Sequence, residues 1–323
     1  MKRRQFLFTT LGLAFGLAGC RSGPSLRLAS YDATREAYSK LKRLYREQFP
    51  ESPSLACSHG SSGSQARAVI DGLPVDLVSL AVKPDLDKIA EKGLIEKDWP
   101  ARYDSGSSPF TSTIVFVVRA GNPFGIEDWP DLIRHPEIKL ITANPKTSGA
   151  AKLGFIAAWG SAKRRSGSEA TADEFVGEVF SRAPVLDTSS RAAAVTFARK
   201  GLGDVQLSWE NDAIREKLDL GDRVQIVRPK SGSLRAEPAI AVVKGGNETE
   251  AHRCAQFLYS ESAQRIFGAN GYRPAVESIG KEFVVDLPPM DLFRVEDLLT
   301  NGWGDAQKRF FNDGGLFDRV ATG

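Results

Sequence analysis

Short apolar segments alternate with amphipathic segments along most of this chain. The first apolar segment, residues 26–29, precedes a stretch in which Tyr38, Leu41, Tyr45 and Phe49 recur at helical spacing. Further strand candidates are residues 75–82, 113–118, 138–142, 205–209 and 239–243, with helical segments between most of them. This alternation predicts an α/β fold, in which helices cover the faces of sheets.

The N-terminus predicts an exported protein. Three basic residues, Lys2, Arg3 and Arg4, precede an apolar run at residues 6–17 that is too short to span a bilayer. The run ends in Leu17-Ala18-Gly19-Cys20, which resembles a bacterial lipobox. We therefore expect residues 1–19 to be a signal peptide.

The lipobox pattern further predicts that Cys20 becomes the lipid-anchored first residue of the mature protein. The protein would then be periplasmic or otherwise extracytoplasmic, and the membrane would be a partner only through this anchor. Cleavage near Ala18, with Cys20 incidental, is the alternative. Arg3-Arg4 also resembles a twin-arginine signal, so the export route and the choice between inner and outer membrane stay open.

The mature chain is electrically neutral. The full sequence has 43 Lys and Arg against 40 Asp and Glu, and the leader holds three of the basic residues and no acidic residue. A neutral chain without a basic block has no electrostatic surface for nucleic acid. We therefore expect no nucleic-acid partner.

The length of the chain predicts two lobes. Most of its 323 residues remain after the leader, which exceeds the roughly 250–300 residues at which one hydrophobic core stops growing. No long linker separates two halves, so we expect the chain to cross between lobes more than once. Cys57 and Cys254 are too few for a disulfide framework, and both pairing and two buried thiols stay open.

Four turns place small polar residues directly before an amphipathic segment. These turns are residues 30–34, 58–64, 144–150 and 187–191. A helix start offers unpaired backbone N–H groups and the positive end of the helix dipole, which together favour an anion. One such turn is no evidence of a site, because Ser, Thr and Asp begin many helices as ordinary caps. Four of them in one chain favour an anion-binding site.

The polar turns also carry a family resemblance. Ser30-Tyr31-Asp32-Ala33-Thr34-Arg35-Glu36 resembles the opening of the periplasmic sulfate-binding proteins, the solute receptors of sulfate and thiosulfate importers. The similarity continues in the family's order through Ser58-His59-Gly60, Asn144-Pro145-Lys146-Thr147-Ser148-Gly149, Ser208-Trp209-Glu210-Asn211, Tyr272-Arg273-Pro274 and Asn312-Asp313-Gly314-Gly315. It covers essentially the whole mature chain.

The resemblance implies the type II periplasmic-binding-protein fold, with two α/β lobes and the ligand cleft between them. Lobe I would comprise residues 20–112 and 238–323, so that the C-terminal segment returns to it. Lobe II would comprise residues 113–237.

The resemblance also implies the sulfate ligands. The seven positions that match the family's set are Asp32, Ser62, Ser148, Gly149, Ala150, Ser190 and Trp209. Ser148 would donate from its hydroxyl, Ser62 from its hydroxyl or main chain, and Trp209 from its indole N–H, while the others would donate backbone N–H. Ala150 and Ser190 stand where the family has Gly and Ala, which leaves their effect on affinity open.

A site made only of N–H and O–H donors favours a fully deprotonated dianion. Phosphate keeps a proton near neutral pH, and leaving that proton without an acceptor costs about 1–3 kcal/mol. We therefore interpret Asp32 as a cap whose carboxylate faces its own helix, and Arg35 and Arg191 as groups outside direct contact with the anion. Thiosulfate, phosphate, molybdate and tungstate are the rival ligands, and the sequence does not rank thiosulfate against sulfate.

Motifs of the enzyme classes considered are absent. His59, His135 and His252 show no metal-ligand spacing, and Gly60-Ser61-Ser62-Gly63 is followed by Ser64 where a nucleophile elbow needs Gly. There is no nucleotide-binding motif. We predict a monomeric binding protein, without catalytic residues, metal or cofactor, that delivers sulfate or thiosulfate to the permease subunits of an ABC importer. An exported ester hydrolase is the alternative.

Overall fold

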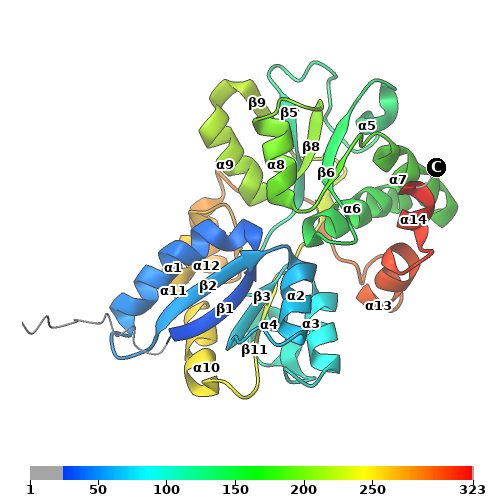
Figure 1. The fold of residues 1–323 in the computed structure, drawn as a ribbon. Coiled ribbons are helices and arrows are strands. Elements are labelled where there is room, and N and C mark those ends of the chain that lie inside the picture. Colours follow the sequence, from blue (N-terminus) through cyan, green and yellow to red (C-terminus); the bar gives the residue numbers. More distant parts are fainter. Residues whose placement is uncertain (1–24, 322–323) are drawn as a thin grey trace, which may run out of the picture.

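Two sheets form the centres of two lobes in the computed structural model, which describes residues 25–321 (Figure 1). The predicted leader and Cys20 lie outside the described residues. The first sheet has the order β11 (Ala239–Val242), β3 (Leu77–Leu80), β1 (Ser25–Tyr31), β2 (Ser54–Gly60). The second has the order β7 (Leu186–Asp187), β6 (Leu140–Ala143), β8 (Val205–Trp209), β5 (Ile114–Arg119), β9 (Val224–Val227). The alternation of strands and helices confirms the predicted α/β class.

The first sheet is parallel except for β11. β1 pairs in parallel with β2 and β3, and Tyr31 lies opposite Gly60, so the chain leaves β1 and β2 at the same edge. The helices of this lobe are α1 (Arg35–Gln48), α2 (Ser62–Ile70), α3 (Lys83–Glu91), α4 (Asp104–Ser107), α10 (Glu248–Phe257), α11 (Glu261–Gly268) and α12 (Glu277–Gly280). In α1 the predicted apolar stripe is buried at Tyr38, Leu41 and Tyr45, and this stripe attaches the helix to the core.

The second sheet is mixed, because β5 runs antiparallel to both β8 and β9. Its helices are α5 (Asp131–Arg134), α6 (Gly149–Ser166), α7 (Glu169–Ser181), α8 (Ser190–Ala198) and α9 (Glu210–Leu220). Most of α6 is buried on all sides, including Phe155 and Trp159. Because α6 is buried on all sides, its sequence has no amphipathic pattern. Its packing in the core also holds its first residues beside the first lobe.

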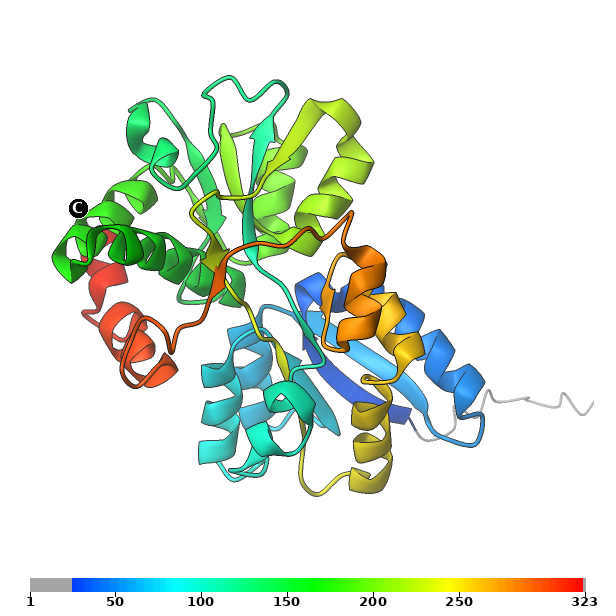
Figure 2. The same ribbon diagram turned by 180° about the vertical axis from the view of Figure 1, so that it is seen from behind.

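Within residues 25–321 the chain passes between the sheets three times (Figure 2). The first passage runs from β4 (Phe110–Thr111) to β5, and the second from β10 (Ser233–Leu234) to β11. Ser112 and Ala236 join these two segments by an antiparallel bridge. The third runs through β13 (Leu292–Phe293), which pairs with β10, after β12 (Arg273–Pro274) has paired with β4. The predicted lobe boundaries at residues 112/113 and 237/238 stay predictions.

Most of the C-terminal segment packs against α6 and α7, although we expected it to return to the first lobe. It consists of α13 (Trp303–Ala306), a π-helical turn η5 (Gln307–Phe311) and α14 (Leu316–Ala321). The rings of Phe310, Phe311 and Phe317 surround Phe155 of α6 at centroid distances of 5.7, 5.6 and 6.0 Å. The assignment of η5 and α14 to lobe I is therefore wrong, because their aromatic side chains complete the core of the second lobe, whereas α13 also contacts α3 of the first lobe.

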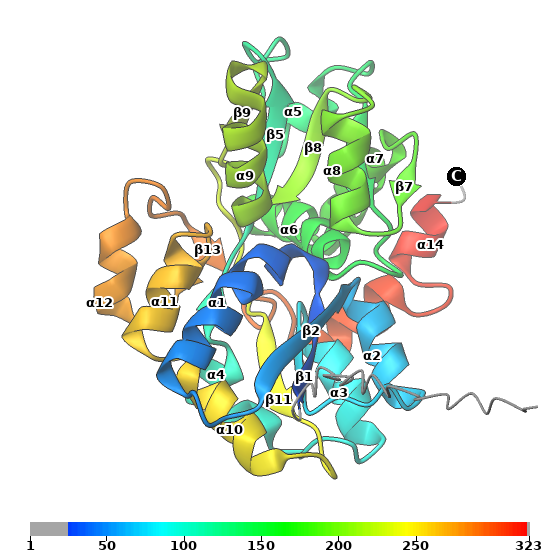
Figure 3. The same ribbon diagram turned by 60° about the vertical axis from the view of Figure 1, so that its left-hand side comes forward.

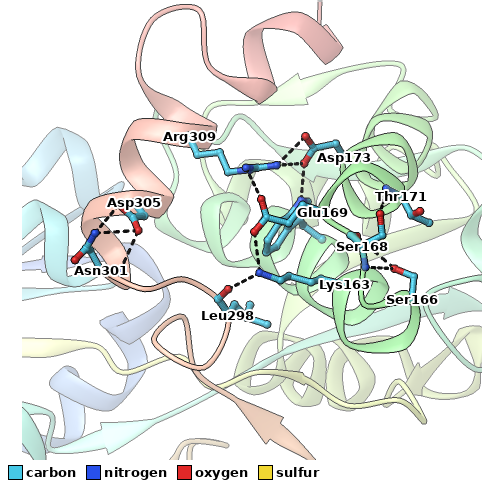
Figure 4. Close-up of polar contacts among 11 residues, drawn as sticks. Lys163, Ser166, Ser168, Glu169, Thr171, Asp173, Leu298, Asn301, Asp305 and Arg309 are labelled. Carbon is cyan, nitrogen blue, oxygen red and sulfur yellow. Dashed lines mark hydrogen bonds and ion pairs between the residues drawn. The ribbon is translucent and has the colours of Figure 1, made fainter.

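Ion pairs at the surface reinforce this attachment (Figure 4). Arg309 donates to both oxygens of Asp173 at 2.9 Å and to Glu169 at 2.7 Å. Lys163 donates to Glu169 at 2.9 Å and to the carbonyl oxygen of Leu298 at 2.8 Å. α7 thus anchors the end of the chain through charge as well as through packing.

In the part of the chain that the structure describes, no helix is both long and apolar enough to cross a membrane.

Candidate functional site

The four polar turns of the sequence meet between the two lobes. The turn after β1 is a 3-10 turn, η1 (Asp32–Thr34), and it contacts α8 of the other lobe. The turns after β2, β6 and β7 lead into α2, α6 and α8. Thr147 Oγ1 donates to the carbonyl oxygen of Thr188 at 2.9 Å, which ties the turn before α6 to the turn before α8. Figure 3 shows η1 below the ends of α6 and α8.

Gly149 touches the wall of the first lobe. A Cβ atom at this position would lie 2.7 Å from the Cβ of Ala81 and 3.3 Å from the Cβ of Ser62. Ser62 Oγ itself donates to Asp85 Oδ2 at 2.7 Å and accepts from the backbone N–H of Ala81 at 3.1 Å. The hydroxyl hydrogen of Ser62 is therefore used inside the first lobe, which leaves the main chain as its donor toward a ligand.

The start of α6 offers a free hydroxyl beside free N–H groups. Ser148 is the N-cap of α6, but its side chain makes no capping bond, and its hydroxyl has no protein partner among residues 25–321. Its backbone N–H is occupied, because it donates to Asn144 O at 2.9 Å. Gly149 and Ala150 follow in the first helical turn, where backbone N–H groups have no intrahelical acceptor.

The Asp32 carboxylate faces the start of α8 in the opposite lobe. Ser190 Oγ donates to Asp32 Oδ1 at 3.4 Å, and the carboxylate also accepts from the Ser189 hydroxyl, the Arg191 backbone N–H and its own N–H. Burial raises the pKa of Asp32, and these hydrogen bonds oppose that rise. The interpretation of Asp32 as a cap of its own helix is therefore wrong: neither η1 nor α1 has a side-chain cap, and every donor except the N–H of Asp32 itself lies across the lobe boundary.

Trp209 closes the site from the second lobe. It ends β8 and is the N-cap residue of α9, and its side chain is 1% exposed. Its ring lies 5.5 Å from the ring of Tyr31, the residue before Asp32, at an interplanar angle of 38°. Among the described residues the indole N–H has no acceptor. Because indole is a donor only, this N–H is available to an acceptor ligand.

Three charged groups beside the site are paired with one another. Glu36 of α1 accepts from Arg191 at 3.2 Å and from Arg215 at 2.7 Å, so two cations of the second lobe bind one carboxylate of the first. Burial, together with Arg35, lowers the pKa of His59 to about 4, and Ser30 Oγ lies 2.6 Å from its Nδ1. His59 is therefore neutral near neutral pH. The immediate site consists of neutral donors and one carboxylate.

Two buried carboxylates on α9 lie behind the site. Burial raises the pKa of Asp212 to about 7 although Arg215 donates to it at 2.9 Å. Burial also raises the pKa of Glu216 to about 7, and Gln206 donates to one of its oxygens at 3.1 Å. Both groups bind protons more tightly in the folded protein than in the unfolded chain.

These carboxylates predict that the protein loses stability as the pH rises. The folded state holds more protons than the unfolded chain between the ordinary pKa of Asp, 3.8, and about 7, so the free energy of unfolding should fall across this window and level off above it. Between about pH 5 and about pH 7.5, Asp212→Asn should remove about 2 kcal/mol of this fall in urea unfolding curves. Asp222→Asn, at a fully exposed position in the turn after the same helix, is the control and should leave the fall unchanged. Equal slopes for wild type and Asp212→Asn would contradict the prediction.

Residues 25–321 contain no cluster of His, Cys, Asp and Glu that could hold a metal ion. Cys57 and Cys254 are both free thiols in the structure, and burial raises the pKa of Cys57 to about 11. Neither thiol is therefore an activated nucleophile.

Comparison with known proteins identifies the family. Residues 26–273 match the family model for bacterial extracellular solute-binding proteins. A sulfate-binding protein of Escherichia coli K12 is 40% identical over 303 residues, which cover 90% of this chain and 91% of that protein. The chain belongs to the sulfate- and thiosulfate-binding protein family. Another relative, a thiosulfate-binding protein of Pseudomonas aeruginosa, is 38% identical over 96% of this chain and 95% of its own.

Solved structures agree with membership of this family. The sulfate-binding protein SubI of Mycobacterium tuberculosis superposes with a TM-score of 0.82 at 32% identity, covering 90% of this chain and 100% of that structure. A ferric binding protein of Campylobacter jejuni, at 15% identity and a TM-score of 0.65, shares the fold alone. The predicted periplasmic-binding-protein fold is confirmed, and the protein is an extracellular or periplasmic solute-binding protein and not an enzyme.

Proposed function

We propose that the protein captures sulfate between its lobes and delivers it to the permease of an ABC importer. The observation that supports this most is the convergence of four helix-starting turns on a buried boundary where the Ser148 hydroxyl and the Trp209 indole N–H have no protein acceptor. The seven positions named from the sequence are the proposed ligands, with Ser62 now assigned a main-chain role. The names of the relatives support sulfate as the ligand.

The donor set favours a dianion that carries no proton. Ser148, Gly149 and Trp209 present hydrogens, and the nearby cations of Arg191 and Arg215 are already engaged by Glu36. Hydrogen bonds to a charged acceptor in a dry site stabilise it without a neighbouring cation. Thiosulfate is the second candidate, because it is also a dianion and the thiosulfate-binding relative matches nearly the whole chain.

Equilibrium dialysis of the protein without its leader against labelled sulfate tests this function. We expect saturable binding of a single sulfate per chain, displaced by unlabelled sulfate and by thiosulfate. An absence of sulfate binding, together with saturable binding of phosphate or molybdate, would overturn the proposal in favour of a receptor for another oxyanion. Turnover of a sulfate or phosphate ester would revive the hydrolase alternative.

We also propose that Cys20 anchors this receptor to a membrane by a lipid. Cys20→Ser removes the thiol that takes the diacylglycerol, so the protein should move from the membrane fraction to the soluble fraction after cell lysis. The control is Ser22→Ala, two residues away in the same segment, which should stay in the membrane fraction. An unchanged distribution of Cys20→Ser would contradict the lipid anchor.

A further inference from the structure

Two of the proposed ligand positions bind each other across the lobe boundary. Ser190, the first residue of α8, donates from its hydroxyl to the carboxylate of Asp32 in η1 at 3.4 Å. Asp32 is 7% exposed and Ser190 is 9% exposed, so water does not compete freely for this contact. The same carboxylate accepts from Ser189 and from the N–H of Arg191. The Asp32 carboxylate of the first lobe thus accepts hydrogen bonds from several donors at the start of α8 in the second lobe.

We propose that the Asp32 carboxylate and the Ser190 hydroxyl form a latch that holds the two lobes together, and that Ser190 acts as a positioning residue without donating its hydroxyl to the anion. The location of the latch at the anion site rests on the proposed function. The contact between the lobes does not depend on which anion binds. The Ser190 main-chain N–H keeps its proposed role toward the anion.

The chemistry of the two groups supports this assignment. A hydroxyl has a single hydrogen, and in this structure Ser190 points it toward Asp32, so the hydroxyl is not available to an anion at the same time. A carboxylate beside the N-terminus of α8 is stabilised by the helix dipole and by the Arg191 N–H. Alanine, which the family resemblance places at position 190, has no hydroxyl and makes no such bond.

The ion pairs nearby do not replace this contact. Arg191 reaches Glu36 at 3.2 Å, but its side chain is 47% exposed and is screened by solvent. The Asp32–Ser190 contact is buried and is therefore less screened by solvent than the Arg191–Glu36 pair. Loss of the hydroxyl should therefore shift the lobes toward an open arrangement, although the Glu36 pairs across the same boundary oppose this shift.

Small-angle X-ray scattering of the protein without its leader, in sulfate-free buffer, tests the latch independently of any ligand. Ser190→Ala and Asp32→Ala should each increase the radius of gyration, and the double variant should show no further increase. Ser190→Thr, which keeps a hydroxyl, should restore the wild-type value. The matched control is Ser61→Ala, because Ser61 Oγ donates to Ser64 Oγ at 2.6 Å within its own lobe. Unchanged scattering for Ser190→Ala and Asp32→Ala would overturn the latch.

Sulfate titrations of the same variants show how Ser190 acts. Ser190→Ala should weaken sulfate binding about three- to tenfold, mainly through faster release, and should have no further effect when Asp32 is already Ala. An equal loss in both backgrounds would mean that the hydroxyl contacts the anion, which would overturn the positioning role. If the wild type binds no sulfate, the proposed function fails while the scattering result still decides the latch.

Discussion

Trp209→Phe should weaken sulfate binding about ten- to hundredfold, which is the effect of losing one hydrogen bond to a charged ligand. The substitution removes the indole N–H and keeps an aromatic ring against Tyr31, whose ring centre lies 5.5 Å away. Calorimetric titration with sulfate measures the affinity. Circular dichroism and the melting temperature should show that the fold is retained.

A second tryptophan gives the control for this substitution. Trp303→Phe, at a half-buried position in α13, should leave the sulfate affinity unchanged within error. Ser148→Ala should weaken binding by an amount similar to that of Trp209→Phe, since it also removes one side-chain donor. Wild-type affinity in Trp209→Phe would contradict the assignment of the indole N–H to the ligand.

Gly149→Val should weaken sulfate binding more than about hundredfold, because it prevents the lobes from meeting. In the closed arrangement a Cβ at position 149 would lie 2.7 Å from the Cβ of Ala81, on a wall of the opposite lobe. The clash disappears when the lobes separate, so each lobe keeps its own packing. Thermal unfolding should therefore change little in the absence of sulfate, while calorimetry should detect little or no binding.

The neighbouring position supplies the control for Gly149. Ala150→Gly introduces the residue that the family resemblance places there, without adding atoms to the interface, and should leave affinity within about threefold of wild type. Tight binding by Gly149→Val would show that sulfate does not require the contact between Gly149 and Ala81. The proposed capture of the anion between the two lobes would then be wrong.

The fold was predictable where local pattern and long-range packing agree. In α1 the stripe of Tyr38, Leu41 and Tyr45 predicted both a helix and its buried face, and the structure buries these residues. The position of Phe310, Phe311 and Phe317 was not predictable in the same way. Their burial depends on Phe155, more than a hundred residues earlier in the chain, and no local pattern encodes which of two lobes an aromatic cluster will join.

The site was predictable at the level of helix starts and less so at the level of single atoms. Turns rich in Ser, Thr and Gly indicated where N–H groups are exposed, and the structure brings them together between the lobes. The direction of the Asp32 carboxylate and the use of the Ser62 hydroxyl depend on Ser190 and Asp85, which are remote in sequence. Remote partners of this kind determine the rotamer of a side chain, whereas the local sequence largely determines the secondary structure.

The most direct test of the central claim is calorimetric titration of the protein without its leader with sulfate and with phosphate near neutral pH. The one carboxylate of the site, Asp32, faces the start of α8, so the anion meets only donors. The site should therefore bind sulfate at least about a hundredfold more tightly than phosphate, because the proton on hydrogen phosphate finds no acceptor. Phosphate binding as tight as sulfate binding would mean that an acceptor, most directly the Asp32 carboxylate, faces the ligand, and would contradict the assignment of this site to sulfate.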